Sequence, residues 1–226
     1  MDLDYIWIVI GILMGAVSGA AVPALSNKLM SVKKRNKTYE TWHMSNIKKS
    51  GYITGTVLLW IGLSIYYPGW KMFYIGIVLT AAMVAAYIDS IHRILPNEIV
   101  FNIAAAGFIF QVLTEGILGV GKALLAMALG GLVFFLASIL TRKTGAVGAG
   151  DVKYIMASGA MVGFPGIINC LFFMAVGLAI YCVGGILIKK LTIYSYFAMG
   201  VFISIGLIMS FFSQPILAVI YTVLYL

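Results

Sequence analysis

Two of the seven acidic residues, Asp89 and Asp151, stand at the ends of long apolar segments. Asp89 follows the uncharged run Ile75–Ile88, and Asp151 opens an apolar segment directly after Gly148-Ala149-Gly150. A carboxylate in or beside an apolar membrane helix is costly and usually functional. Two converging carboxylates can share one proton, so that one activates a water molecule while the protonated partner polarises a peptide carbonyl. The pair therefore indicates aspartyl protease chemistry.

Each aspartate also has a purely structural interpretation. Asp89 could pair with Arg93 one helical turn later, and Asp151 could cap the helix that it opens. The glycines before Asp151 (Gly145, Gly148 and Gly150) favour a functional interpretation. Residues without a Cβ allow unusual backbone angles and close approach of another segment. We therefore expect these glycines to deliver Asp151 to a site.

Other protease chemistries fit this sequence less well. The chain has two histidines, His43 and His92, and no paired-histidine metalloprotease motif, which excludes a zinc protease of that type. Ser158 lies in an apolar segment to which neither histidine can be assigned as a base, so a serine nucleophile is disfavoured. We expect no catalytic metal.

The elements that must position these residues are membrane-spanning helices. Apolar residues make up 62% of the chain and charged residues 10%, whereas soluble domains carry about 25% charged residues. Backbone groups inside a bilayer must bond within their own segment, which favours helices, and the alternating pattern of a β-barrel is missing from the sequence. The sequence predicts an all-α, polytopic transmembrane helix bundle.

We predict about eight spans, separated by Pro, Gly and charged residues. Because Asp2 and Asp4 precede the first apolar run, we expect that run to be a true span rather than a cleaved signal peptide. Several spans are shorter than the ~20 residues of a straight crossing, so the sixth could be re-entrant. The predicted spans are Tyr5–Leu25, Gly51–Tyr67, Met72–Ile91, Glu98–Leu113, Gly121–Thr141, Val152–Gly163, Ile167–Ile188 and Tyr196–Phe212, with Pro215 ending the last one before an apolar tail.

The distribution of positive charge predicts the orientation. The net charge is +8, and a basic loop, Ser26–Ser50, follows the first span. If this loop is cytoplasmic, only Lys71 and Lys122 of the 15 basic residues lie on the opposite side. Both aspartates then lie at the cytoplasmic ends of their spans. A cytoplasmic loop explains the basic residues better than nucleic-acid binding does. We divide the chain into residues 1–50, the first span with its loop, and 51–226, the core.

Small residues within the spans have packing roles in this interpretation. Gly11, Gly15 and Gly19 recur every four residues on one face of the first span, as in a seam for a neighbouring helix. Cys170 and Cys182 lie twelve residues apart in one apolar run, about 18 Å along a helix, which is too far for a disulfide.

At the two aspartates the sequence resembles the type IV prepilin peptidase family of GxGD membrane aspartyl proteases. Asp89 is followed by Leu95-Pro96-Asn97, and the segment from Gly148 to Lys153 matches G-x-G-D-x-K. The order of the two motifs and their common side agree with the family. The resemblance covers most of the chain and is specific around the aspartates.

The resemblance implies removal of the short basic leader from type IV prepilins or pseudopilins at the cytoplasmic face of the inner or cytoplasmic membrane. It implies that Asp89 and Asp151 are the catalytic pair. Gly148, Gly150, Lys153 and Pro96 take supporting positions. Proteolysis would need no cofactor, and the partners would be the pilin substrates and the bilayer.

The sequence departs from the family in two places. Larger members carry two CxxC pairs in the first cytoplasmic loop, whereas Ser26–Ser50 contains no cysteine, so we expect no metal site there. Many members also methylate the new N-terminus with S-adenosylmethionine. The segment Gly15–Asn27 departs from the expected pattern, so that cofactor is needed only if this chain also methylates.

Two other functions are compatible with the same residues. A proton- or cation-coupled transporter could use Asp89 and Asp151 as relay groups, although transporters usually hold such sites near the midplane and show internal repeats. A non-catalytic assembly protein could retain both motifs. Glu98, at the start of the fourth span, is interpreted as a favourable charge at a helix amino end rather than as a catalytic group.

Overall fold

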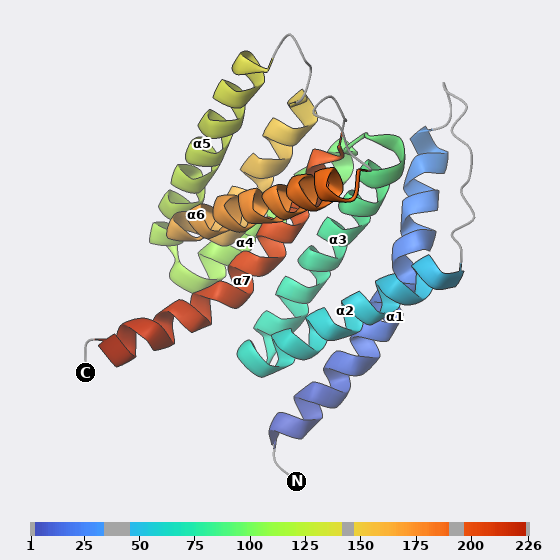
Figure 1. Cartoon of the computed structure of the whole chain (residues 1–226). Helices are drawn as coiled ribbons and strands as arrows, with labels where there is room; N and C mark the ends of the chain where they lie inside the picture. Colours follow the sequence, from blue (N-terminus) through green and yellow to red (C-terminus); the bar gives the residue numbers. More distant parts are fainter. Residues whose placement is uncertain (1–2, 34–45, 142–146, 190–196, 225–226) are drawn as a thin grey trace. The chain divides into compact units, whose positions relative to one another are not determined.

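The computed structural model is helical in all its regular elements over the residues that it describes. It describes the backbone of residues 3–33, 46–141, 147–189 and 197–224, and their side chains except those of 3–4, 32–33, 46–49 and 214–224. The helices are α1 (Leu3–Lys33), α2 (Asn46–Tyr66), α3 (Trp70–His92), α4 (Asn97–Glu115), α5 (Ile117–Leu140), α6 (Ala149–Leu187) and α7 (Met199–Leu224), as Figure 1 labels them.

The helices have the length and the surface of membrane spans. Large apolar side chains of α5, among them Leu132, Phe135 and Ile139, are exposed, as a surface that faces lipid requires. Two apolar segments, Ser50–Tyr66 and Met199–Ser213, are shorter. The predicted all-α membrane bundle is confirmed. Within the described residues, five helices are long and apolar enough to cross a membrane: Tyr5–Ser31, Trp70–His92, Asn97–Glu115, Ile117–Leu140 and Ala149–Leu187.

The chain divides into two compact units, Met1–Tyr87 and Ile88–Leu226. Helix α3 crosses this boundary, so its last turn, which carries Asp89, belongs to the second unit. The second unit therefore contains both aspartates and their flanking motifs. The predicted division into 1–50 and 51–226 rests on a different criterion and stays a prediction.

In the first unit, α1 and α2 pack along the predicted glycine seam. A Cβ on Gly15 would lie 2.6 Å from the Cα of Val57, and one on Gly19 would lie 2.7 Å from the Cα of Ile53. The buried Thr56 hydroxyl donates a hydrogen bond to the Gly15 carbonyl at 2.9 Å. Because no side chain fits between the two backbones, the seam needs glycine. The prediction of a packing role is confirmed.

In the second unit, α6 is the central helix and packs against α4, α5 and α7. Gly159 of α6 lies against the backbone of α5 at Ala126, and Gly206 of α7 lies against Cys170 of α6. Cys170 is buried, and both Cys170 and Cys182 are free, as predicted. Small residues thus let the helices approach closely where hydrophobic side chains would hold them apart.

Helix α6 is broken where the sequence predicts the end of the sixth span. Gly163 has φ 64° and ψ −178°, Phe164 is extended, and Pro165 follows. Figure 1 shows that the gold first part and the orange second part of α6 run in different directions. The predicted spans six and seven therefore correspond to the two helical parts of α6, which the non-helical Gly163 and Phe164 separate.

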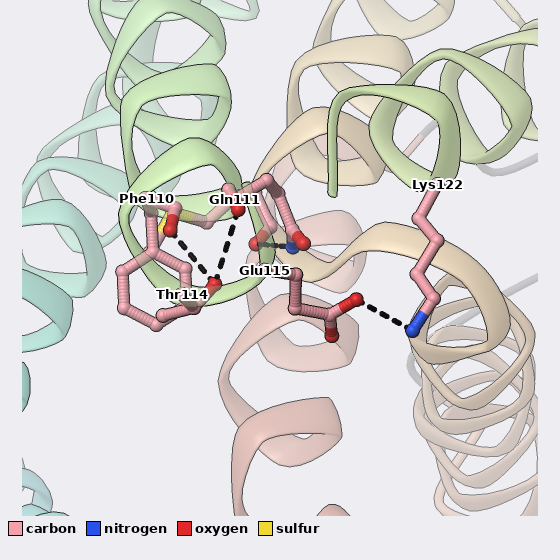
Figure 2. A network of polar contacts seen from close by, with 6 residues as sticks. Phe110, Gln111, Thr114, Glu115 and Lys122 are labelled. Atoms are coloured by element: carbon pink, nitrogen blue, oxygen red, sulfur yellow. Dashed lines mark hydrogen bonds and ion pairs between the residues drawn. The ribbon is translucent and has the colours of Figure 1, made fainter. Parts of the chain in front are cut away.

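Gln111 of α4 compensates for the break. In a regular helix the Met161 carbonyl would accept a hydrogen bond from residue 165, but a proline has no N–H. The buried Gln111 side chain donates from Nε2 to this carbonyl at 3.0 Å instead. Figure 2 shows the amide of Gln111 reaching from α4 to α6. An apolar environment makes such a replacement important, because water cannot supply the missing donor.

Other polar contacts lie beside this amide, within the last turns of α4 and between α4 and α5. The Thr114 hydroxyl donates to the Phe110 carbonyl at 2.8 Å and lies 3.3 Å from that of Gln111. Glu115 and Lys122, both partly exposed, form an ion pair at 2.6 Å (Figure 2). An ion pair this exposed contributes little stability, so the buried amide is the important member of the network.

We expect Gln111→Leu to destabilise the protein by about 1–3 kcal/mol, because it leaves the Met161 carbonyl buried without a donor. Thermal unfolding in detergent micelles measures the change. Thr114→Val is the matched control, since it removes a hydroxyl whose acceptors lie within its own helix. An equal loss of stability in both variants would contradict this role for Gln111.

Three predicted boundaries are wrong. The basic loop does not begin at Ser26, because α1 continues past Pro23 to Lys33. It does not reach Ser50 either, since α2 begins at Asn46. At the other end of the chain, Pro215 does not stop α7, which runs to Leu224. In apolar surroundings a helix keeps the remaining backbone groups bonded to one another, and this favours continuation past a single proline.

Candidate active site

Asp89 lies in the last turn of α3 and is buried, with 5% of its surface exposed. Its Oδ2 accepts a hydrogen bond from the backbone N–H of Gly200 at 2.8 Å. Gly200 is in the first turn of α7, so the carboxylate sits at the positive end of that helix. This backbone N–H, which α7 fixes in place, offsets part of the cost of burying the carboxylate.

The chain leaves α3 directly after Asp89 in a way that the local sequence explains. The Arg93 N–H still bonds to the Asp89 carbonyl at 2.8 Å, and Arg93 then adopts φ 52°. The pairing of the Asp89 carboxylate with the Arg93 side chain stays a prediction. Pro96 is buried and forms the N-cap of α4, with its carbonyl accepting from Ile99 and Val100. Pro96 therefore starts the next helix and has a structural role.

Asp151 lies in the first turn of α6 and caps that helix. Its Oδ2 accepts a hydrogen bond from the Gly148 N–H at 2.9 Å, and its own N–H bonds back to the Gly148 carbonyl. The carboxylate at the third helical position thus accepts from the N–H of the N-cap residue, which is one half of a capping box. The predicted structural interpretation of Asp151 is thus correct for its local contacts. Lys153, two residues later, is exposed.

The two sequence motifs meet at Leu95. A Cβ on Gly150 would lie 3.6 Å from the Cβ of Leu95, which is ordinary van der Waals contact. Leu95 also lies against Gly200, where a Cβ would come 3.0 Å from its Cδ2. Leu95 therefore joins three segments: the connection after α3, the start of α6 and the start of α7.

The described glycines before Asp151 show neither the unusual backbone angles nor the close approach that we expected. Gly148 is exposed with φ −90°, an angle that any residue adopts, and Gly150 is helical with room for a Cβ. Gly145 lies outside the described residues. The position near the aspartates where a side chain is excluded is Gly200, which the sequence analysis did not single out.

Sequence reasoning also missed two buried hydroxyls. Tyr154, one turn after Asp151, and Ser204, one turn after Gly200, are hydrogen bonded to each other at 2.7 Å. The Ser204 hydroxyl donates to the Gly200 carbonyl at 2.8 Å. Their spacing from Asp151 and Gly200, three and four residues, places them on the same helix faces as those residues. That spacing was the signal available in the sequence.

Leu95 links the surroundings of the two carboxylates, because it lies against Gly200, which donates to Asp89, and against Gly150, which precedes Asp151. The tertiary structure therefore brings both predicted aspartates, together with Gly148 and Gly150, to the same end of the second unit. Pro96 lies next to Leu95 at the edge of this cluster, Lys153 is on its exposed side, and Glu98 is an exposed residue in the first turn of α4. Among the described residues, no group of three His, Cys, Asp or Glu side chains is arranged to hold a metal ion.

Comparisons with known proteins identify the family of this chain. The model of the type IV leader peptidase family matches residues 76–224. That range includes both aspartates, Leu95 and the amino end of α7, and it leaves out α1, α2 and the first residues of α3. Searches of curated proteins and of solved structures gave no match. Since the family model covers more than half of the sequence, the chain belongs to the type IV leader peptidase family.

Proposed function

We propose that this membrane peptidase is an aspartyl endopeptidase in which Asp89 and Asp151 form the catalytic pair. The observation that carries the proposal is that Leu95 lies against both Gly150, next to Asp151, and Gly200, which donates to the buried Asp89. A lone buried carboxylate has only a desolvation cost, whereas two adjacent carboxylates can hold one proton between them. Family membership supports peptide hydrolysis over the transporter alternative.

In the proposed reaction the carboxylate pair first takes a proton from water and later gives a proton to the leaving nitrogen. The ionised carboxylate takes a proton from water as the water oxygen bonds to the peptide carbonyl carbon, and the protonated carboxylate polarises the carbonyl oxygen. In the tetrahedral intermediate the C–N bond then breaks, and the leaving nitrogen receives a proton from the pair. One water molecule is consumed, no cofactor is required, and the pair returns to its starting state.

The proposed substrates are prepilins or pseudopilins with a short basic leader, cut at the cytoplasmic face of the cell's inner or cytoplasmic membrane. The charge distribution of the sequence supports this orientation, since Arg93 and Lys153 lie on the same side as the aspartates. A leader at the membrane surface would reach the ends of α3 and α6, and its apolar helix would remain in the bilayer. Nucleic acid has no part in the proposal.

The test is to incubate the purified protein in detergent with a prepilin and to weigh the products by mass spectrometry. We expect a new N-terminus at the end of the leader. A second reaction with S-adenosylmethionine tests methylation, which would add the mass of one methyl group. Gly15 and Gly19, in the segment Gly15–Asn27, lie against the backbone of α2. An intact prepilin in both reactions would contradict the proposed proteolysis.

A further inference from the structure

Gly200 is the one position in the described aspartate cluster where an added Cβ would collide with a carboxylate. It would lie 2.8 Å from Asp89 Oδ2, 3.0 Å from Leu95 Cδ2 and 3.1 Å from Asp89 Cγ. The corresponding distance at Gly148, to Asp151 Oδ2, is 3.5 Å. The first turn of α7 can therefore approach Asp89 only because residue 200 has no side chain.

Two buried hydroxyls fix the place of this first turn. Ser204 donates its hydroxyl hydrogen to the Gly200 carbonyl, so it can receive but not donate in its bond with Tyr154. Tyr154, which is fully buried, is the donor to Ser204, because the single hydroxyl hydrogen of Ser204 is used in the bond to Gly200. Three hydrogen bonds thus connect Tyr154 to Ser204, Ser204 to the Gly200 carbonyl, and the Gly200 N–H to Asp89.

These hydrogen bonds join the helices that carry the two aspartates. Tyr154 belongs to α6, one turn after Asp151, and Gly200 donates to Asp89 at the end of α3. Ser210 is also buried on α7, and its hydroxyl donates to the Leu207 carbonyl of its own helix. Ser204 differs from it because its second partner comes from a neighbouring helix.

We propose that the amino end of α7 is a third part of the active site, in which Gly200 is a positioning residue for Asp89 and the Tyr154–Ser204 bond sets the place of Gly200. The inference rests on the proposed aspartyl protease function. If this inference holds, the position of the Asp89 carboxylate depends on α7, whose own position depends on its hydrogen bond to Tyr154 of α6. Loss of any link displaces the carboxylate without removing a group that touches the substrate.

The first test replaces Gly200 by alanine. We expect kcat for prepilin cleavage to fall by about 100-fold, the cost of a displacement of about 1 Å in a catalytic site, with KM for the prepilin unchanged. Gly177→Ala is the matched control, because a Cβ there meets only ordinary contacts at 3.7 and 3.8 Å. Thermal unfolding in detergent is the check that both variants are folded.

The second test examines the hydroxyls. Ser204→Ala and Tyr154→Phe should each lower kcat by about tenfold, the effect of one hydrogen bond, and shift the pH profile of kcat. The double variant should be no slower than the slower single variant, since both substitutions break the same link. Ser204→Thr keeps the hydroxyl and should restore kcat. Ser210→Ala, the control on the same helix, should keep the wild-type rate and pH profile.

The outcomes separate this inference from the proposed function. A wild-type kcat in folded Gly200→Ala, or a kcat loss in Ser210→Ala equal to that in Ser204→Ala, would overturn the positioning role while Asp89→Asn remains inactive. Full activity of the Asp89→Asn variant would instead overturn the aspartyl mechanism, and the positioning role with it.

Discussion

Replacing either aspartate by asparagine is expected to abolish prepilin cleavage. The amide oxygen of asparagine can still accept the hydrogen bond from Gly200 at position 89 or from Gly148 at position 151. The fold therefore keeps its local contacts, but the pair can no longer share a proton. General acid–base catalysis contributes about 10²–10⁴-fold, and we expect kcat to fall by at least that range.

The double variant tests whether the two carboxylates act as one unit. If they do, Asp89→Asn and Asp151→Asn together should reduce kcat no further than either alone. Single-turnover cleavage of a prepilin, followed by gel electrophoresis or mass, measures each rate. Glu98→Gln is the matched control, because it neutralises an exposed carboxylate in the first turn of α4. Normal processing by either single variant would show that the pair is not catalytic.

The second large effect is expected at the break in α6. Gly163 has φ 64° and ψ −178°, a conformation that side chains avoid at a cost of about 1–3 kcal/mol. A Cβ there would also lie 2.7 Å from Gln111 Nε2 and would displace the amide from the Met161 carbonyl. We expect Gly163→Ala to lower the free energy of unfolding by about 2–4 kcal/mol, from strain and a lost buried hydrogen bond.

Thermal or denaturant unfolding in detergent micelles measures this change. Gly184→Ala is the control in the same helix, since a Cβ there has no atom within 4 Å and alanine favours a helix by about 1 kcal/mol over glycine. It should be neutral or stabilising. A Gly163→Ala variant as stable as Gly184→Ala would mean that the backbone at the break is not constrained as the structure indicates.

Together, the two substitutions separate chemistry from architecture. The asparagine variants should unfold like the wild type while losing activity. Gly163→Ala should lose stability first, since Gly163 belongs to the packing of α4 against α6 and carries no group that reacts. Comparing the loss of activity with the loss of stability in each variant, on the same preparation, therefore distinguishes an effect on the site from an effect on the fold.

The sequence by itself determined the properties that depend on local chemistry. Long uncharged runs require helices in a bilayer, because the backbone has no other partners there. The break at Phe164-Pro165-Gly166 followed from the missing N–H of proline, and the Gly11, Gly15 and Gly19 seam followed from its spacing of four. Sequence proximity gave the capping contact of Asp151 with Gly148, three residues away. Proline was a less reliable signal at Pro23 and Pro215, where the helices continue.

Only the tertiary structure decided which residues surround the aspartates. Asp89 and Gly200 are 111 residues apart, Tyr154 and Ser204 are 50 apart, and so are Gln111 and Met161. No local pattern specifies such contacts, because they depend on how the faces of different helices pack together. The glycines next to Asp151 drew attention through their number, yet the glycine that a carboxylate touches lies at the start of α7. The motifs identify which side chains can react, and the packing of α6 against α7, which places the N–H of Gly200, determines how Asp89 is held.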